Sequence, residues 1–263
     1  TFVSELFKQG GYATGLFGKW HLAPGAQSKG FDHIAPTGYN KHWDPTINGK
    51  KYKGYRTDVI FGLAMEWMDQ QLERRTPFFC HISTNNAHNS PDPNGPGNIF
   101  VAPKEFTDPM KGNVKSPDLL QKYGMIANFD MNFGRLLKYL DERGIADNTI
   151  LIFMTDNGMT SRLGPEGYNG GMRGTKDSEY RGGSRVPFLF RYPAEIQGDR
   201  TVDELTGGMD FLPTMVDLCG LPKKEGIDGI SLAPLLRGEV QSLPDRFLPH
   251  HHRLAYGKVL ESK

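Results

Sequence analysis

Residues 11–21 read GYATGLFGKWH. A Gly-Gly pair ends an amphipathic segment over residues 1–9, and an apolar run of strand length follows over residues 12–17. The run leads directly into residues 18–21, which carry a glycine, a lysine and a histidine. In open α/β sheets, ligands gather at the carboxyl ends of strands. The stretch therefore predicts a strand whose carboxyl end carries a functional loop.

The rest of the chain repeats this alternation of strands and helices. Apolar residues at helical spacing predict long helices over residues 56–75 and 118–143 and a short one over 210–218. Apolar runs of strand length stand at residues 78–83, 149–154 and 186–190. Such alternation predicts an α/β fold, with a mostly parallel central sheet sandwiched by helices.

Composition narrows the class of protein. Hydrophobic residues make up 37% of the 263 residues and charged residues 23%, as in globular proteins. The 31 basic and 30 acidic residues give a net charge of +1, which argues against a nucleic-acid-binding protein. No apolar run approaches the roughly 20 residues that span a bilayer. We expect Cys80 and Cys219 to be two buried free thiols.

Lys19 and His21 form the first candidate cluster. They stand two residues apart, so an extended backbone would point both side chains to the same side, where an ammonium and an imidazole suit an oxyanion. Taken alone, the pair fits a solvated lysine and a hydrogen-bonded loop histidine equally well.

Three further candidates follow predicted strands. His88 comes soon after residues 78–83 and could act as a general acid, because the pKa of imidazole lies near neutrality. Asp156 and Asn157 end the next strand and offer hard oxygen ligands suited to Ca²⁺ or Mg²⁺, although Asp-Asn-Gly is also an ordinary turn sequence. Lys176 stands on a Gly-rich loop, where it could meet an anion or simply be solvated.

Several motifs in order resemble one family. The chain is similar to the sulfatase family of the alkaline phosphatase superfamily, and the similarity extends to about Gly238. It rests on residues 11–22, on Tyr55-Arg56-Thr57-Asp58, on residues 134–137 and 146–149, on Thr155-Asp156-Asn157-Gly158, and on the block from Arg173-Gly174-Thr175-Lys176 to Arg185-Val186-Pro187. The resemblance implies a partial sulfatase-type catalytic domain over residues 1–240. We expect an irregular segment that starts a smaller subdomain over residues 241–263.

The resemblance also implies a metal and sulfate site. Asp156 and Asn157 match metal ligands of the family, with Ca²⁺ expected and Mg²⁺ as the alternative. Lys19 and Lys176 match lysines that bind the sulfate group.

The two histidines match residues next to the reacting atoms. His21 corresponds to a histidine that contacts the nucleophile, and His88 to the one that protonates the leaving alcohol. Two positions depart from the family pattern: Asp177 stands where glycine is frequent, and Arg181 where glutamate is frequent.

The nucleophile of the family is a formylglycine made from Cys or Ser in a Cys/Ser-x-Pro-x-Arg motif upstream of the stretch that opens this chain. The same upstream region carries an Asp-Asp pair that completes the metal site. The formal match at residues 242–246 stands in the wrong order and is rejected. Since Thr1 lies inside a predicted helix, we expect the domain to be truncated at its N-terminus and the 263 residues to be inactive by themselves.

The resemblance predicts a sulfatase that cleaves a small-molecule or carbohydrate sulfate ester, and it suggests a periplasmic or secreted location. Two alternatives stay open: a phosphodiesterase or phosphonate hydrolase of the same superfamily, and a non-catalytic relative that binds anions or glycans. Nothing in the sequence indicates nucleic acid as a partner, and oligomeric state is not readable from it.

Overall fold

The structure, a computed structural model, describes residues 2–22, 25–38, 42–91, 97–254 and 258–262. The chain divides into two compact units. Unit 1 comprises Thr1–Arg143 and Met209–Ser231, and unit 2 comprises Gly144–Gly208 and Leu232–Lys263. The domain boundary at residue 240 that the sequence suggests stays a prediction.

Unit 1 is built on a three-stranded parallel sheet in the order β2-β1-β5. Its strands are β1 (Ala13–Gly18), β2 (His33–Pro36) and β5 (Phe78–Ser83). Gly18, at the end of β1, pairs with Pro36 and with Ser83, so the carboxyl ends of all three strands meet at one edge. The predicted parallel sheet is confirmed, and β5 has the predicted bounds.

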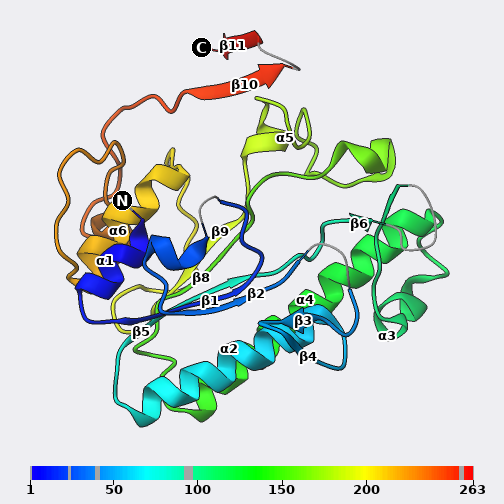
Figure 1. Ribbon diagram of the computed structural model, residues 1–263. Helices are drawn as coiled ribbons and strands as arrows, with labels where there is room; N and C mark the ends of the chain where they lie inside the picture. Colours follow the sequence, from blue (N-terminus) through cyan, green and yellow to red (C-terminus); the bar gives the residue numbers. More distant parts are fainter. Residues whose placement is uncertain (1, 23–24, 39–41, 92–96, 255–257, 263) are drawn as a thin grey trace. The chain divides into compact units, whose positions relative to one another are not determined.

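Helices cover both faces of this sheet (Figure 1). The helix α2 (Arg56–Glu73) packs against β1 and β5, and α4 (Pro117–Glu142) packs against α2. On the other face lie α1 (Val3–Gln9) and α6 (Phe211–Cys219), which contact each other. All four helices lie within two residues of their predicted bounds.

Aromatic packing holds the two layers together. Leu16 and Phe17 of β1 are almost fully buried, and Phe17 lies 5.6 Å from the ring of Trp67 on α2. A Cβ at Gly15 would lie 3.0 Å from Trp67, so this glycine lets the indole approach the sheet. On the other face, Phe7 of α1 stacks on Phe79 at 4.4 Å. These contacts fix the strand that leads to Lys19.

The other elements of unit 1 are short. They are η1 (Ala26–Lys29), β3 (Thr46–Ile47), β4 (Lys50–Lys51), β6 (Ser90–Pro91), β7 (Asn98–Ile99), α3 (Lys104–Thr107), η2 (Asp108–Met110) and η4 (Gly208–Asp210), which leads into α6. The two cysteines, Cys80 and Cys219, are free and partly buried.

Unit 2 contains a two-stranded antiparallel sheet of β8 (Leu151–Met154) and β9 (Phe188–Arg191). Both strands were predicted, but their pairing departs from the parallel arrangement. The connection between them carries no long crossover helix: it is a Gly-rich loop with η3 (Ser161–Glu166) and α5 (Arg181–Ser184). A parallel pair requires a crossover, usually an α-helix, whereas an antiparallel pair does not.

The end of the chain adds α7 (Ala233–Arg237) and a hairpin of β10 (His250–Leu254) and β11 (Lys258–Ser262). The sequence did not indicate this hairpin. Among the described residues, no helix is both long and apolar enough to cross a membrane.

Candidate functional site

The carboxyl end of β1 fixes the position of Lys19. Gly18 has a φ of +105°, and a Cβ there would lie 2.1 Å from the carbonyl oxygen of Ser83. The backbone N–H of Lys19 donates to that same carbonyl at 2.6 Å. Only glycine allows β1 and β5 to approach so closely, so the motif places the half-buried Lys19 at the edge where the carboxyl ends of the strands meet.

The loop after β1 is only partly described. His21 is exposed, and residues 23–24 lie outside the described part of the chain. Trp20 stacks edge-on against Phe31 at 5.9 Å, and its buried indole N–H has no hydrogen-bond partner among the described residues. That His21 and Lys19 point to the same side stays a prediction.

A second connection joins the ends of β2 and β5. Thr37 donates its backbone N–H to the carbonyl of Gly18 at 2.9 Å and its hydroxyl to Oδ1 of Asn85 at 3.1 Å. Both side chains are buried. The loops that follow β1, β2 and β5 are therefore tied to one another.

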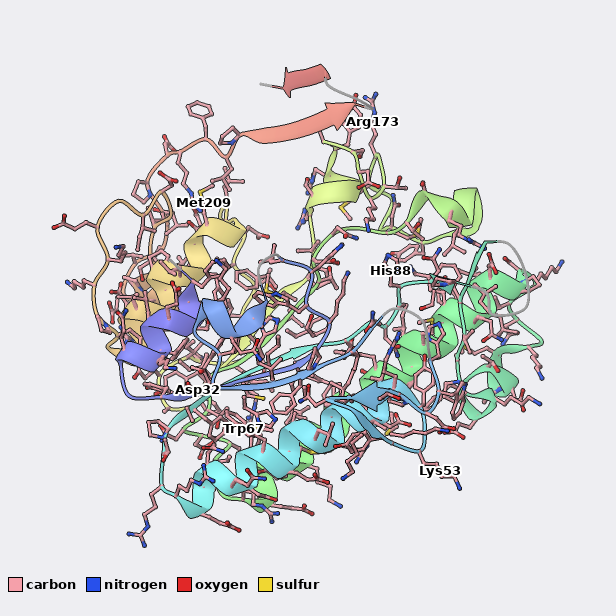
Figure 2. All side chains as sticks on the ribbon, viewed as in Figure 1. Asp32, Lys53, Trp67, His88, Arg173 and Met209 are labelled. Carbon is pink, nitrogen blue, oxygen red and sulfur yellow. The ribbon has the colours of Figure 1, made fainter. Side chains whose placement is uncertain are left out.

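His88 stands on the loop after β5, which runs alongside α4 (Figure 2). Its backbone N–H donates to the carbonyl of Asn85 at 2.6 Å, and its ring Nδ1 lies 2.5 Å from the carbonyl oxygen of Asn89. A carbonyl only accepts hydrogen bonds, so this contact requires the proton of the ring to be on Nδ1. The ring is exposed and therefore accessible to a substrate.

Asn86 attaches this loop to both long helices. Its Nδ2 donates to the carbonyl of Met125 at 2.7 Å and to Oδ1 of Asn128 at 3.2 Å. Its Oδ1 lies 3.2 Å from the hydroxyl of Tyr55, whose proton is shared with the carbonyl of Val101 at 2.7 Å. No role for Asn86 was predicted from the sequence, because an Asn in a loop is an ordinary turn residue.

Asp58, in the first turn of α2, supports Asn86 indirectly, through Asn128. Its Oδ1 accepts from Asn128 at 2.8 Å and from Asn132 at 2.6 Å, and both of these asparagines are fully buried. Arg135 in turn donates to Oδ1 of Asn132 at 2.8 Å. The Tyr-x-Thr-Asp resemblance pointed to this segment without a role, and the structure shows that it anchors the loop of His88.

Two further buried polar residues were missed by sequence reasoning. Arg56 donates to the carbonyl of Gly38 at 2.8 Å, and its other terminal nitrogen is buried without a partner among the described residues. Burial lowers the pKa of Arg56 to about 10. Burial, and secondly the charge of Arg56, lower the pKa of His42 to about 4. His42 is therefore neutral at pH 7. Isolated polar residues in loop-rich sequence carry no signal of such burial.

Unit 2 presents Asp156 and Asn157 directly after β8. Asp156 is exposed, and Asn157 is half-buried, with its Nδ2 donating to the carbonyl of Gly158 at 2.8 Å. This bond uses the amide nitrogen of Asn157 and leaves its oxygen as the atom suited to a cation. The two residues thus offer carboxylate and amide oxygens at the end of one strand.

Lys176 stands on the long loop of the same unit, between β8 and β9. Its backbone N–H donates to the carbonyl of Met159 at 2.7 Å, and Gly158 donates to the carbonyl of Gly183 at 2.9 Å. A Cβ at Gly158 would lie 1.9 Å from the carbonyl oxygen of Gly182. The glycines therefore bring the two halves of the long loop into contact, and Lys176 with them.

The departures from the family pattern have a structural context. Asp177 has a φ of +67°, a left-handed conformation in which glycine is favoured and Asp is among the better tolerated alternatives. Arg181 begins α5 and is exposed. Its neighbour Tyr180 stacks under Arg173, whose guanidinium lies 3.8 Å from the ring centre.

The candidate residues fall into two groups, one in each unit, which we name half-site 1 and half-site 2. That the two groups serve one site stays a prediction. Half-site 1 holds Lys19, His21 and His88, and half-site 2 holds Asp156, Asn157 and Lys176. The oxygen donors of half-site 2 fit a hard dication in kind. Their number does not suffice, because Ca²⁺ takes 6–8 oxygens, and the described residues contain no group of three or more His, Cys, Asp or Glu side chains suited to a metal.

A comparison with models of known protein families identifies the family of this chain. The family model named Sulfatase matches residues 1–221. The chain belongs to the sulfatase family. This family of the alkaline phosphatase superfamily comprises hydrolases of sulfuric esters, which typically use a divalent metal.

Relatives match along much of this sulfatase chain. It is 29% identical to the uncharacterized sulfatase YdeN of Escherichia coli over 94% of the chain and 49% of YdeN. It is 27% identical to human N-acetylgalactosamine-6-sulfatase over 92% of the chain and 49% of that enzyme. It is 37% identical to human steryl-sulfatase over 69% of the chain and 30% of that enzyme. The chain spans about half the length of the first two relatives.

Solved structures confirm the α/β fold. Ps i-CgsB in complex with k-i-k-neocarrahexaose matches with a TM-score of 0.81 and 25% identity, over 95% of this chain and 60% of that one. The phosphonate monoester hydrolase SpPMH from Silicibacter pomeroyi matches with a TM-score of 0.64 and 18% identity, over 95% of this chain and 63% of that one. The second likeness concerns the fold alone.

Proposed function

We propose that the protein hydrolyses a sulfate monoester with the help of a divalent cation, Ca²⁺ before Mg²⁺. The observation that carries this proposal is the pair of half-sites in a chain of the sulfatase family. Cationic and imidazole groups follow the parallel strands of unit 1, and hard oxygen ligands with a lysine follow β8 of unit 2. A sulfate ester needs both kinds of group.

The lysines and the acidic pair have complementary tasks. The ammonium groups of Lys19 and Lys176 would bind the sulfate oxygens and stabilise the negative charge that develops on them in the transition state. Asp156 and Asn157 would hold the cation, which supplies charge stabilisation and polarises the sulfate. Their oxygens are two of the 6–8 that Ca²⁺ takes, so further ligands must come from other residues.

The histidines would handle the proton and the nucleophile. His88, protonated at Nε2, would donate that proton to the leaving alcohol oxygen as the ester bond breaks. His21 would contact the nucleophile, for which we propose a formylglycine contributed by another part of the protein. We do not propose residues 242–246 for this role, because that segment follows the other motifs along the chain instead of preceding them.

For the substrate class we propose a carbohydrate sulfate. Support comes from two similar proteins. One is an N-acetylglucosamine-6-O-sulfatase of Bacteroides thetaiotaomicron, 25% identical over 96% of this chain and 60% of that enzyme. The other, Ps i-CgsB, was solved in complex with k-i-k-neocarrahexaose. The likeness in fold to a phosphonate monoester hydrolase keeps phosphonate ester hydrolysis as the second candidate.

The test is an assay of the full-length protein on 4-nitrophenyl sulfate, on a panel of sulfated monosaccharides and on a phosphonate monoester. We expect turnover of sulfate esters that a chelator removes and that Ca²⁺ restores better than Mg²⁺. Asp156→Ala and Lys176→Ala should each lower kcat/KM at least about 100-fold. The controls are Asp203→Ala and Lys224→Ala, which alter exposed residues outside both half-sites.

Faster turnover of the phosphonate monoester than of every sulfate ester would favour the second candidate. Unchanged activity in both Asp156→Ala and Lys176→Ala would contradict the assignment of half-site 2. The polypeptide of residues 1–263 alone should show no turnover, because it lacks the proposed nucleophile.

A further inference from the structure

The loop of His88 is attached to the protein through one side chain. Asn86 stands two residues before the histidine, and all its hydrogen-bonding groups are used: both N–H bonds point to α4, at Met125 and Asn128, and its oxygen faces Tyr55. An amide with every donor and acceptor satisfied has one preferred orientation. Asn86 therefore fixes the loop backbone with respect to two helices.

The partners of Asn86 are themselves held. Asn128 is fully buried, donates to Asp58 and is backed by Asn132, which donates to the same carboxylate oxygen and to the carbonyl of Asn128 at 2.9 Å. Tyr55 is buried at the start of α2. A satisfied buried network of this kind is rigid, because each alternative arrangement leaves a buried polar group unpaired.

Two contacts join His88 to its own loop. Its backbone N–H donates to the carbonyl of Asn85, and its Nδ1 lies against the carbonyl oxygen of Asn89. Because these contacts tie the ring to the loop, the attachment of the loop affects where Nε2 is presented. A proton donor must reach the leaving oxygen at about 2.6–3.2 Å, and a displacement of about 1 Å can cost about 100-fold in rate.

We infer that Asn86, held by Tyr55 and by the pair of Asn128 and Asp58, is a positioning residue that aims His88 at the leaving oxygen of the substrate. This role rests on the proposed function, since it gives His88 a proton to deliver. The Tyr-x-Thr-Asp segment and two asparagines of α4 then help to position the proton donor, and they do not themselves contact the substrate.

Leaving groups of different basicity test this role. An alkyl sulfate releases a basic alkoxide and needs the acid, whereas 4-nitrophenyl sulfate releases a stable phenolate and hardly needs it. In the full-length protein, His88→Ala shows the full effect of losing the acid. We expect kcat on the alkyl sulfate to fall about 100-fold or more and kcat on 4-nitrophenyl sulfate to change little. Asn86→Ala should show the same selectivity, with an alkyl-sulfate loss of about 10- to 100-fold.

Tyr55→Phe is the milder variant, because it removes one hydroxyl and keeps the ring that packs beside His42. We expect the same selective loss at about 3- to 10-fold, a part of the effect of Asn86→Ala. Its matched control is Tyr139→Phe, which likewise removes one side-chain hydroxyl. The hydrogen bond lost there joins α4 to α2 and runs from the hydroxyl of Tyr139 to Asp69 at 2.8 Å. Tyr139→Phe should leave the ratio of the two kcat values unchanged.

Equal losses on both sulfate esters in Asn86→Ala and Tyr55→Phe would overturn the inference, since a general weakening of the fold does not distinguish leaving groups. The same selective loss in Tyr139→Phe would overturn it as well. If the unsubstituted protein turned over neither ester, the proposed function would fail, and the role of Asn86 with it.

Discussion

Half-site 1 stands on loops that buried side chains hold, whereas half-site 2 stands on loops that glycine backbones hold. In unit 1, Thr37 binds Asn85 and the helices bind Asn86, so the loops after the strands are fixed by side-chain hydrogen bonds. In unit 2, the backbones at Gly158 and Gly182 approach so closely that no Cβ fits between them.

The difference matches the chemistry proposed for each half. A proton donor must be aimed at one atom, and a network of satisfied side chains provides one orientation. Residues that bind a cation and a sulfate group need their oxygens and charges left available, and tight backbone packing holds Asp156 and Lys176 without using those groups. A loop can therefore be held either by buried side-chain hydrogen bonds or by close packing of glycine backbones. Different substitutions are expected to disrupt the two kinds of loop.

The largest effect is expected where glycine packing is broken. Gly158→Ala would place a methyl group 1.9 Å from the carbonyl oxygen of Gly182, so the two parts of the loop must separate. We expect turnover of sulfate esters by the full-length protein to fall at least about 100-fold, because the loop segments that carry Asp156 and Lys176 are displaced. The control is Gly198→Ala in the same unit, where an added Cβ meets no atom within 4 Å. Full activity in Gly158→Ala would show that half-site 2 does not depend on this packing.

The next effect belongs to the side-chain network of unit 1. Asp58→Ala removes the acceptor of two buried amides, and we expect it to lower the free energy of unfolding by about 3–5 kcal/mol. Asp58→Asn keeps one acceptor oxygen and should lose less. Urea unfolding followed by circular dichroism measures both variants. A loss below about 1 kcal/mol in Asp58→Ala would mean that water replaces the carboxylate, and the network would not be the source of rigidity.

The sequence predicted β1, β5, β8, β9 and the longer helices, because these depend on local apolar periodicity, and the bounds of β5 agree with the prediction. It did not predict β2 of the central sheet, nor the close approach of β1 and β5 that Gly18 allows. The sequence did not predict the antiparallel pairing of β8 with β9. Pairing direction depends on the path of the long connection, and a Gly-rich loop leaves that path open.

The supporting network was also beyond the sequence. Asn86 and Asn128 are 42 positions apart, and neither stands out in its own segment. An Asn on a helix is read as a weak helix former, and only the packed structure shows that its amide is buried and bonded. The six candidate residues were found by local motifs, and whether their side chains meet one substrate stays a prediction.

In unit 1, the buried His42 is expected to make the stability of the fold depend on pH. His42 has a pKa of about 4 in the folded chain and about 6.5 when unfolded, so the unfolded state binds the proton more tightly. The contribution of neutral His42 to the free energy of unfolding is fully present above pH 6.5. It is lost as the pH falls toward 4, by up to about 3 kcal/mol. His42→Phe, which keeps a ring beside Tyr55, should flatten this part of the pH profile. Parallel profiles of both proteins between pH 7 and 4.5 would contradict the burial of a neutral imidazole.

The smallest change in stability is expected for a substitution of Asp156. This substitution is the most direct test of the contrast between the two half-sites. Asp156 is exposed, and its carboxylate has no hydrogen bond or ion pair with the residues that the structure describes. Asp156→Ala should therefore change the free energy of unfolding by less than about 0.5 kcal/mol without added metal. Added Ca²⁺ should raise the stability of the unsubstituted full-length protein more than that of the variant, because only the former keeps the full ligand set. A large loss without metal would show that this carboxylate holds the fold, as Asp58 does, and the contrast between the two half-sites would then fail.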